Sequence, residues 1–505
     1  MVKKWTPVII ALLMVFSGCS KPKVTQTPSA PQTTSIPGVL EYSLDDTAIF
    51  SNDLRSDQAG IVSRYPLTDI YLIEVNLGDD LTGLNGHMKV RYFNRLDADL
   101  GEVYFRLLPN LWGLLMQVST VSVNGIAITP RLENDDTALY IPLKKTVTSG
   151  GHTDIDLDFE VIIPQDDSGN YGTFGYQKGI LALAQFYPLI PLRDENGWRI
   201  ELYPPDGDVT VTEVANYLVR ISAPENLKMA ATGIQISREV KDGRQVITQV
   251  AALSREFYMA GSADYLSQTL ARDGIEYTIY SNNGVAPAAK ESLDYIINAV
   301  DIFTQRYGEY PYRELECVAT PTSAGGVEYP GIMAINQVLF DPDEMLSGMS
   351  ASALIESVIV HEVAHEWFYN IVGNDQGREP WLDEAMAQYL TYQYFHDRYN
   401  ASVAGSFEES WWSRWDRVQR ETKPIGLPVE AYEGREYGAI VYGRGPLFLE
   451  ALSREMGEAK FDQFLKDYFT TYAWKVATTQ DFQSRAEETC GCDLDPIFNE
   501  WVYMK

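Results

Sequence analysis

The chain has 505 residues, of which 45% are hydrophobic, and a formal net charge of −30 at pH 7. This length is enough for about two to four domains with cores of their own, and the apolar fraction is ordinary for a globular protein. The strong negative charge repels phosphate groups, which argues against nucleic acid as a partner.

Residues 1–19 have the features of a secretory signal peptide that ends in a lipid attachment site. Two lysines precede an apolar run at 8–16, which is shorter than the roughly 20 residues that a membrane-spanning helix needs. The tripeptide Ser17-Gly18-Cys19 resembles a bacterial lipobox, in which the cysteine receives lipid and becomes the mature amino end. We therefore expect Cys19 to anchor the protein to a bacterial membrane, outside the cytoplasm. An ordinary cleaved signal that contains this cysteine is the alternative.

The next region is predicted to be a tether followed by a β domain. Residues 20–39 are rich in Ser, Thr, Pro and Gln, which predicts a disordered tether. Beyond them, runs such as 154–161 alternate apolar and acidic residues, as half-buried strands do, and turn residues separate the runs. Long helical patterns are missing. Residues 40–265 are therefore predicted to form an antiparallel β sandwich or saddle, for which a binding module is the ordinary interpretation.

One loop of this β domain carries a candidate binding residue, Gln185. The patch at 184–188, Ala-Gln-Phe-Tyr-Pro, combines aromatic and polar side chains on a predicted loop. We expect this loop to face a site formed with the rest of the chain. Packing of the loop against its own domain is the alternative.

Residues 266–505 mix predicted strands and helices, which indicates an α+β catalytic domain with a helical C-terminal half. Within it, Gly325 and Gly326 precede Glu328, and two glycines before a carboxylate let the backbone approach a ligand closely. A plain Gly-rich turn is the alternative.

The pentapeptide HEVAH begins at His361 and lies in a predicted helix at 351–369. Two histidines four residues apart, here His361 and His365, point the same way from a helix and can hold one zinc ion. Glu362 is then placed to act as general base on a water. Glu384, at the start of the next predicted helix, supplies a third ligand and leaves a fourth position for water. Chance occurrence is the alternative, but two of the chain's five histidines fall in this motif.

Two cysteines near the C-terminus, Cys490 and Cys492, have a single residue between them. The chain's four cysteines are too few for a disulfide framework, and this pair is expected to bridge only under strain. A metal role for the pair is disfavoured, because no histidine or further cysteine stands nearby.

Taken in chain order, these features resemble the zinc aminopeptidases of the aminopeptidase N type, a gluzincin family that includes leukotriene hydrolase. HEVAHEWF followed by WLDEA resembles the family's HExxH-x18-E motif, with 18 residues between His365 and Glu384. The stretch GGVEY at 325–329 resembles its Gly-x-Met-Glu-Asn exopeptidase motif. The stretch YGRG at 442–445 resembles its Tyr-x-Lys-Gly motif, and residues 481–501 resemble the end of its thermolysin-like domain.

The resemblance implies a role for each matching residue. His361, His365 and Glu384 bind one zinc ion per chain. Glu362 polarises the attacking water and then protonates the leaving amine. The remaining implied roles are Glu328, beside Gly325 and Gly326, for the substrate's α-amine, Tyr442 for the oxyanion, Tyr437 as a second active-site tyrosine, and Gln185 for the first side-chain pocket.

The chain also departs from the family pattern. Arg444 replaces the lysine of the Tyr-x-Lys-Gly motif, which keeps the charge but changes its geometry. The chain ends where the family usually continues into a C-terminal helical domain that closes over the site, so an open cleft is expected. The other departures are Asp383, Ala385, Val327 and Tyr329, which replace Asn, Gly, Met and Asn.

The sequence therefore predicts a zinc-dependent aminopeptidase, held on a membrane by lipid, that removes amino-terminal residues from peptides. A zinc endopeptidase is the first alternative, if Glu328 does not face the site. The second is a surface binding lipoprotein in which the β domain acts and the peptidase fold is inert. Retention of both histidines, both glutamates of the zinc motif and Tyr442 argues against inertness.

Overall fold

A computed structural model describes residues 38–166, 169–202, 210–282, 287–346 and 348–504. The predicted signal peptide, the lipidation site Cys19 and nearly all of the predicted tether lie outside these residues. Within them, no helix is both long and apolar enough to cross a membrane.

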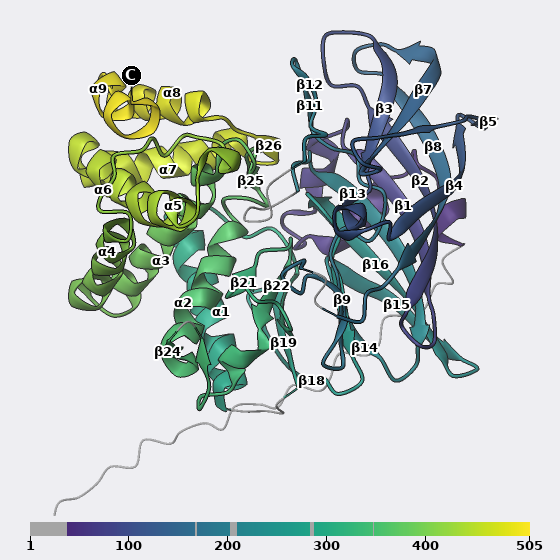
Figure 1. Cartoon of the computed structure of the whole chain (residues 1–505), viewed down its shortest axis with the longest axis horizontal. Helices are drawn as coiled ribbons and strands as arrows, with labels where there is room; N and C mark the ends of the chain where they lie inside the picture. The colour runs from purple at the N-terminus through teal and green to yellow at the C-terminus, as the bar shows by residue number, and fades with distance from the viewer. Residues whose placement is uncertain (1–37, 167–168, 203–209, 283–286, 347, 505) are drawn as a thin grey trace, which may run out of the picture. The chain divides into compact units, whose positions relative to one another are not determined.

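The first region of the described chain is built of β-sheets around a shared core (Figure 1). Its largest sheet has eight strands in the order β15-β16-β13-β1-β2-β8-β4-β5. Neighbouring strands run antiparallel except β1 and β13, which are parallel with Asp69 opposite Ala215. The strands are β1 Asp69–Leu77, β2 Gly83–Phe93, β4 Met116–Val123, β5 Ile126–Ala127, β8 His152–Ile162, β13 Ala215–Pro224, β15 Ile234–Lys241 and β16 Arg244–Ser254.

Smaller sheets complete this region. A four-stranded sheet has the order β14-β17-β10-β9, a three-stranded sheet has the order β3-β7-β6, and β11 pairs with β12. Their strands are β3 Leu100–Arg106, β6 Arg131–Glu133, β7 Ala138–Val147, β9 Phe174–Gln177, β10 Ile180–Leu183, β11 Arg193–Asp194, β12 Gly197–Trp198, β14 Lys228–Ala231 and β17 Met259–Ser262. The predicted sheet-rich fold is confirmed, with one parallel pair that the alternating pattern did not indicate.

Strand β1 shows that this sheet lies between two hydrophobic cores. Ile70 and Leu72 lie in the largest hydrophobic core, whereas Tyr71 and Ile73 on the opposite face lie in the core of the β region. A strand buried on both faces has a nearly continuous apolar sequence rather than an alternating one, as this strand does. The largest core also contains residues from the helices of the second region, so both regions are joined by buried apolar surface.

The second region begins with a five-stranded sheet in the order β18-β19-β20-β22-β21. Strand β21 is an edge strand, antiparallel to β22, with Gly326 opposite Ile335. The strands are β18 Leu266–Arg272, β19 Ile275–Ser281, β20 Glu314–Thr320, β21 Gly326–Val327 and β22 Ile332–Asn336; short pairs are β23 Met345–Leu346 with β24 Met349–Ser350, and β25 Val372–Gly373 with β26 Lys475–Val476.

Helices follow and gather on the side away from the β region (Figure 1). They are α1 Pro287–Arg306, α2 Ala351–His365, α3 Glu384–Arg398, α4 Ala401–Asp416, α5 Glu436–Ala439, α6 Gly445–Met456, α7 Glu458–Tyr472, α8 Thr479–Cys490 and α9 Asp495–Phe498. A disulfide joins Cys490 and Cys492, the pair that the sequence expected to bridge only under strain. The predicted division of the chain between 265 and 266 stays a prediction, because the described residues on both sides belong to one compact unit.

Candidate active site

Helix α2 carries the HEVAH motif through the middle of the largest core. It packs between α1, α3 and β22, and its apolar residues Ile359, Val360 and Val363 are fully buried. The helix ends at His365, four residues earlier than the predicted end at 369. The carbonyl of His365 accepts a hydrogen bond from the amide of Asn370, five residues on, so the helical spacing is broken there.

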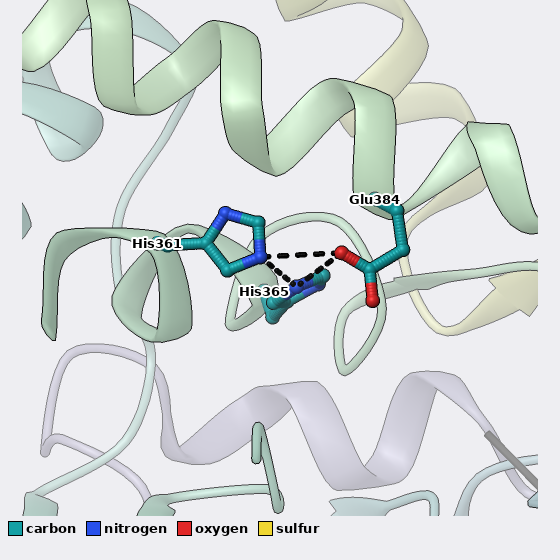
Figure 2. Close-up of side chains that lie close together, drawn as sticks. All are labelled: His361, His365 and Glu384. Atoms are coloured by element: carbon teal, nitrogen blue, oxygen red, sulfur yellow. Dashed lines mark hydrogen bonds and ion pairs between the residues drawn. The ribbon is translucent and has the colours of Figure 1, made fainter. Parts of the chain in front are cut away.

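The three predicted metal ligands converge on one point (Figure 2). His361 Nε2 lies 3.2 Å from Glu384 Oε2 and 3.3 Å from His365 Nε2, and His365 Nε2 lies 3.7 Å from the same carboxylate oxygen. Helix α2 supplies the histidines and the first residue of α3 supplies the glutamate, whose backbone amide is capped by Asp383 at 2.8 Å.

This geometry fits a single zinc ion. Donor atoms about 2.1 Å from a tetrahedral metal stand roughly 3.4 Å from one another, which matches the three observed separations. Both imidazole rings have a hydrogen-bond partner at Nδ1, which leaves Nε2 directed at the metal position. Gln388 Nε2 lies 3.3 Å from His361 Nδ1, and the carbonyl of Phe368 lies 3.2 Å from His365 Nδ1. Partners of this kind fix the ring orientation of metal-binding histidines.

The charges around the ligands also favour a cation. Burial lowers the pKa of His365, but the carboxylates of Glu328, Glu384 and Glu362 outweigh it and raise that pKa well above its usual value. Burial raises the pKa of Glu384, but its two histidine partners outweigh it and hold that pKa well below its usual range. Three buried carboxylates at one point concentrate negative potential, which a divalent cation neutralises.

Glu362 and the glycine motif are in close contact. A Cβ atom added to Gly326 would lie 2.5 Å from Glu362 Oε1, so only glycine lets edge strand β21 approach this carboxylate so closely. At Gly325 the same addition would meet only Val358, at 3.4 Å. Burial, followed by the nearby charge of Glu328, raises the pKa of Glu362 well above its usual value.

Glu328 lies just after β21 and reaches the same site. Its carboxylate lies close to the carboxylate of Glu362 and the ring of His365, and the potential ligand atoms of the three side chains are within 4.8 Å of one another. Gln376 Nε2 donates to Glu328 Oε1 at 3.2 Å. The side chain is buried, and among the described residues only Gln376 donates a side-chain hydrogen bond to it, so it is suited to receive a cationic group.

A cavity of about 770 Å³ opens on the metal ligands. It brings together residues from both regions of the chain, including all but one of the predicted site residues that the structure describes. The predicted residues that line it are Gln185, Gly325, Gly326, Glu328, His361, Glu362, Glu384, Tyr437 and Tyr442. His365 is 1% exposed and lies behind the others.

The two predicted tyrosines, Tyr437 and Tyr442, lie next to each other, and Tyr442 lies near His361. The ring centre of Tyr442 lies 6.3 Å from that of His361 and 5.6 Å from that of Tyr437. Tyr442 belongs to a π-helical turn, Ile440–Arg444, a geometry that is frequent at functional sites. Arg444 turns away from the cavity and donates to the carbonyls of Lys423, Glu500 and Trp501, so its charge does not act in the site.

Two charged residues of the cavity, Glu256 and Arg414, were not predicted from the sequence. Glu256 follows the end of β16 and accepts hydrogen bonds from Gln185 Nε2 and, at 2.7 Å, from the hydroxyl of Tyr369. Arg414 lies on α4 beside Tyr442. Neither belongs to a motif, because each reaches the cavity only through the tertiary fold.

The fold and the site define a class of protein, the HExxH metallohydrolases in which two histidines and a downstream glutamate hold the metal. Residues 291–501 match the family model of the peptidase family M1 domain. This match confirms the resemblance to zinc aminopeptidases of the aminopeptidase N type.

Similar proteins are known from plants, animals and bacteria. Aminopeptidase M1-B of Oryza sativa subsp. japonica is 24% identical over 310 residues, which are 57% of this chain and 34% of the rice protein. The puromycin-sensitive aminopeptidase of Caenorhabditis elegans is 22% identical over 448 residues, 83% of this chain and 44% of that protein. The chain thus spans about a third to just under half of these curated relatives.

A solved bacterial structure shares the fold over nearly its whole length. The M1 zinc metallopeptidase of Deinococcus radiodurans is 17% identical, with a TM-score of 0.65 over 86% of this chain and 93% of that chain. A mutant of the same protein has been solved with a Tyr-Ser-Ala substrate bound, at a TM-score of 0.65 and 18% identity.

Proposed function

We propose that the protein is a zinc-dependent aminopeptidase that hydrolyses the first peptide bond of peptides with a free amino terminus. The observation that carries this proposal is that Glu328 lies in the cavity beside Glu362 and is grouped with Glu362 and His365. A carboxylate beside the metal ligands binds an α-ammonium and thereby places the first peptide bond at the reaction centre. The solved relative that holds a tripeptide supports peptides as the substrate class.

His361, His365 and Glu384 would hold the zinc ion. When bound, zinc polarises the scissile carbonyl and lowers the pKa of water to about 7. Glu362 accepts the proton of the attacking water and passes it to the leaving amine. The hydroxyl of Tyr442 donates a hydrogen bond to the oxyanion that develops on the carbonyl, and Glu328 keeps the α-ammonium in place throughout.

The position of Glu328 also weighs against the two alternatives. An endopeptidase needs a cleft through which the chain can continue on both sides of the scissile bond. Here the carboxylate of Glu328 lies in the cavity near His365. An inert binding protein has no reason to keep a general base buried against a glycine, as Glu362 is against Gly326.

Cleavage of matched peptides tests the proposal. We expect a free-amine peptide to lose residues stepwise from its amino end, and its N-acetylated copy to be resistant. A chelator should abolish the activity, zinc should restore it, and His365→Ala should lose most of the bound zinc. Equal cleavage of free and acetylated peptides would reject the aminopeptidase and favour the endopeptidase. No cleavage of either peptide by zinc-loaded protein would favour the inert binding protein.

We further propose that the mature protein is a lipoprotein, anchored outside the cytoplasm to a bacterial membrane through Cys19. Its support is the sequence of residues 1–19, together with the disulfide between Cys490 and Cys492, since such bonds persist in oxidising compartments. Cys19→Ala should move the protein from the membrane fraction to the soluble fraction, whereas Ser29→Ala in the predicted tether should not. Mass spectrometry that finds an unmodified mature amino end would reject the anchor.

A further inference from the structure

The charges that line the active-site cavity are uneven. Four carboxylates line it, those of Glu256, Glu328, Glu362 and Glu384, whereas Arg414 is the one lysine or arginine among its described lining residues. Three of the carboxylates have a use in the proposed reaction as metal ligand, base or amine site, and Glu256 holds Gln185. The guanidinium has no such use.

Arg414 is held by uncharged neighbours. Its Nη1 donates to the backbone carbonyl of Tyr442 at 3.3 Å, and its Cζ lies 5.8 Å from the centre of the Tyr442 ring. It makes no ion pair with any residue that the structure describes. Arg414 is half-buried, and burial lowers the pKa of its guanidinium. A partly buried guanidinium with unused donors is a site for an anion.

Arg414 and the amine site lie against different ligands of the metal. Glu328 is grouped with His365, whereas Arg414 touches Tyr442, whose ring centre lies 6.3 Å from that of His361. A peptide whose α-ammonium is bound by Glu328 therefore has its scissile carbonyl at the metal ligands and its remaining residues beyond them. The Tyr442 ring centre lies 6.3 Å from that of His361 and 5.8 Å from Arg414 Cζ. An extended chain advances about 3.3–3.6 Å per residue, so each of these separations is shorter than two residues.

We propose that Arg414 binds the C-terminal carboxylate of short peptides, so that the enzyme favours di- to tetrapeptides with both termini free. This inference rests on the aminopeptidase function proposed above. In this arrangement Glu328 binds the substrate's ammonium group and Arg414 binds its carboxylate. Peptides longer than about four residues carry their carboxylate past Arg414 and gain nothing from it.

Pairs of peptides that differ only at the C-terminus test the carboxylate site. The probes are Leu-Ala-Ala as the free acid and as the amide, and the measurement is the ratio of their kcat/KM values. We expect wild type to favour the acid about tenfold to a hundredfold, which is the size of a charge-assisted hydrogen bond. Arg414→Gln should bring the ratio close to one, and Arg414→Lys should keep part of it. Arg417→Gln removes an exposed charge at the end of the same helix and should leave the ratio at the wild-type value.

Two further comparisons make the outcome decisive. For seven-residue peptides the acid and the amide should be cleaved alike by wild type. If wild type cleaves the tripeptide acid and amide with equal kcat/KM, the inference is overturned, even if Arg414→Gln does not fold. An equal loss on acid and amide in Arg414→Gln also overturns it and leaves Arg414 as a support for Tyr442. Leucine anilide separates this inference from the proposed aminopeptidase function. If wild type cleaves the anilide but cleaves the tripeptide acid and amide alike, only the carboxylate site is rejected.

Discussion

The two regions of the molecule contribute to the active site in different ways. The helical region supplies the proposed metal ligands and Glu362 from two regular elements, α2 and the start of α3, which are close in sequence and pack against each other. The β region supplies Gln185 and Glu256 from separate irregular segments. In the proposed reaction, the groups for the chemistry thus come from helices, and the groups near the substrate's amino end come partly from loops held by tertiary contacts.

Arg255 shows how the loop contribution is held in place. It lies in the β region and donates to the carbonyls of Thr212, Tyr369 and Lys475, so it joins both regions at one point. Its guanidinium packs directly on Gly373, where an added Cβ would lie 2.0 Å from Arg255 Cζ. The adjacent residue Glu256 is thereby presented to the cavity from a fixed backbone.

The largest expected effect comes from the helical contribution, at Glu362. Glu362→Gln keeps the size of the side chain but removes its ability to accept a proton, so kcat should fall about 10³–10⁴-fold. Zinc content should stay at the wild-type level, because Glu362 is not a ligand in the proposed site. Glu409→Gln, on an exposed position of α4, is the matched control and should behave as wild type. Turnover within about tenfold of wild type would remove Glu362 from the role of base.

A smaller loss is expected at Tyr442. Tyr442→Phe removes one hydrogen-bond donor to the oxyanion, which is worth about 10²–10³-fold in kcat at comparable sites. Tyr399→Phe removes the hydroxyl of a half-exposed tyrosine that donates to Glu356 and does not line the cavity, so it should change kcat little. A rise in KM with unchanged kcat would make Tyr442 a residue for substrate binding instead.

Substitution of two neighbouring glycines tests the contact between edge strand β21 and Glu362 of helix α2. Gly326→Ala places a methyl group 2.5 Å from Glu362 Oε1 and must displace the carboxylate or the strand. A shift of about 1 Å in a catalytic group costs roughly 10²-fold, and we expect a loss of that size in kcat. Gly325→Ala meets only Val358 at 3.4 Å, so its loss should be much smaller. Equal losses in the two variants would mean that close approach to Glu362 is not the reason for the second glycine.

The same contrast explains how much of this site the sequence predicts. His361 and His365 are a helical turn apart and Glu384 follows at a fixed spacing, so a single stretch of sequence places them together, and the structure does bring them to one point. Gln185 was predicted from the composition of its loop and from a family resemblance, and it does line the cavity. Glu256 and Arg414 carry no local signal, since what makes them part of the site is the packing of segments far apart in the chain. The parallel pairing of β1 with β13 was missed for the same reason.

The smallest expected effect belongs to the β region and concerns Glu256. This carboxylate accepts from Gln185 and Tyr369 and lies near Glu328, and burial raises its pKa to about 7. It is therefore neutral at lower pH and ionised at higher pH, so it attracts the substrate's ammonium group only as the pH rises through about 7. We expect wild-type KM for free-amine peptides to fall over that interval.

Glu256→Gln keeps the shape of this side chain and most of its hydrogen bonds but cannot ionise. Its KM above pH 7 should be about tenfold higher than that of wild type, since a single charge-assisted contact is lost while kcat depends on groups it does not touch. The fall in KM between pH 6 and 8 should disappear in this variant and persist in Glu239→Gln, an exposed position on β15. A lower kcat with an unchanged KM would place Glu256 with the chemistry of the helical region and remove the contrast between the two regions.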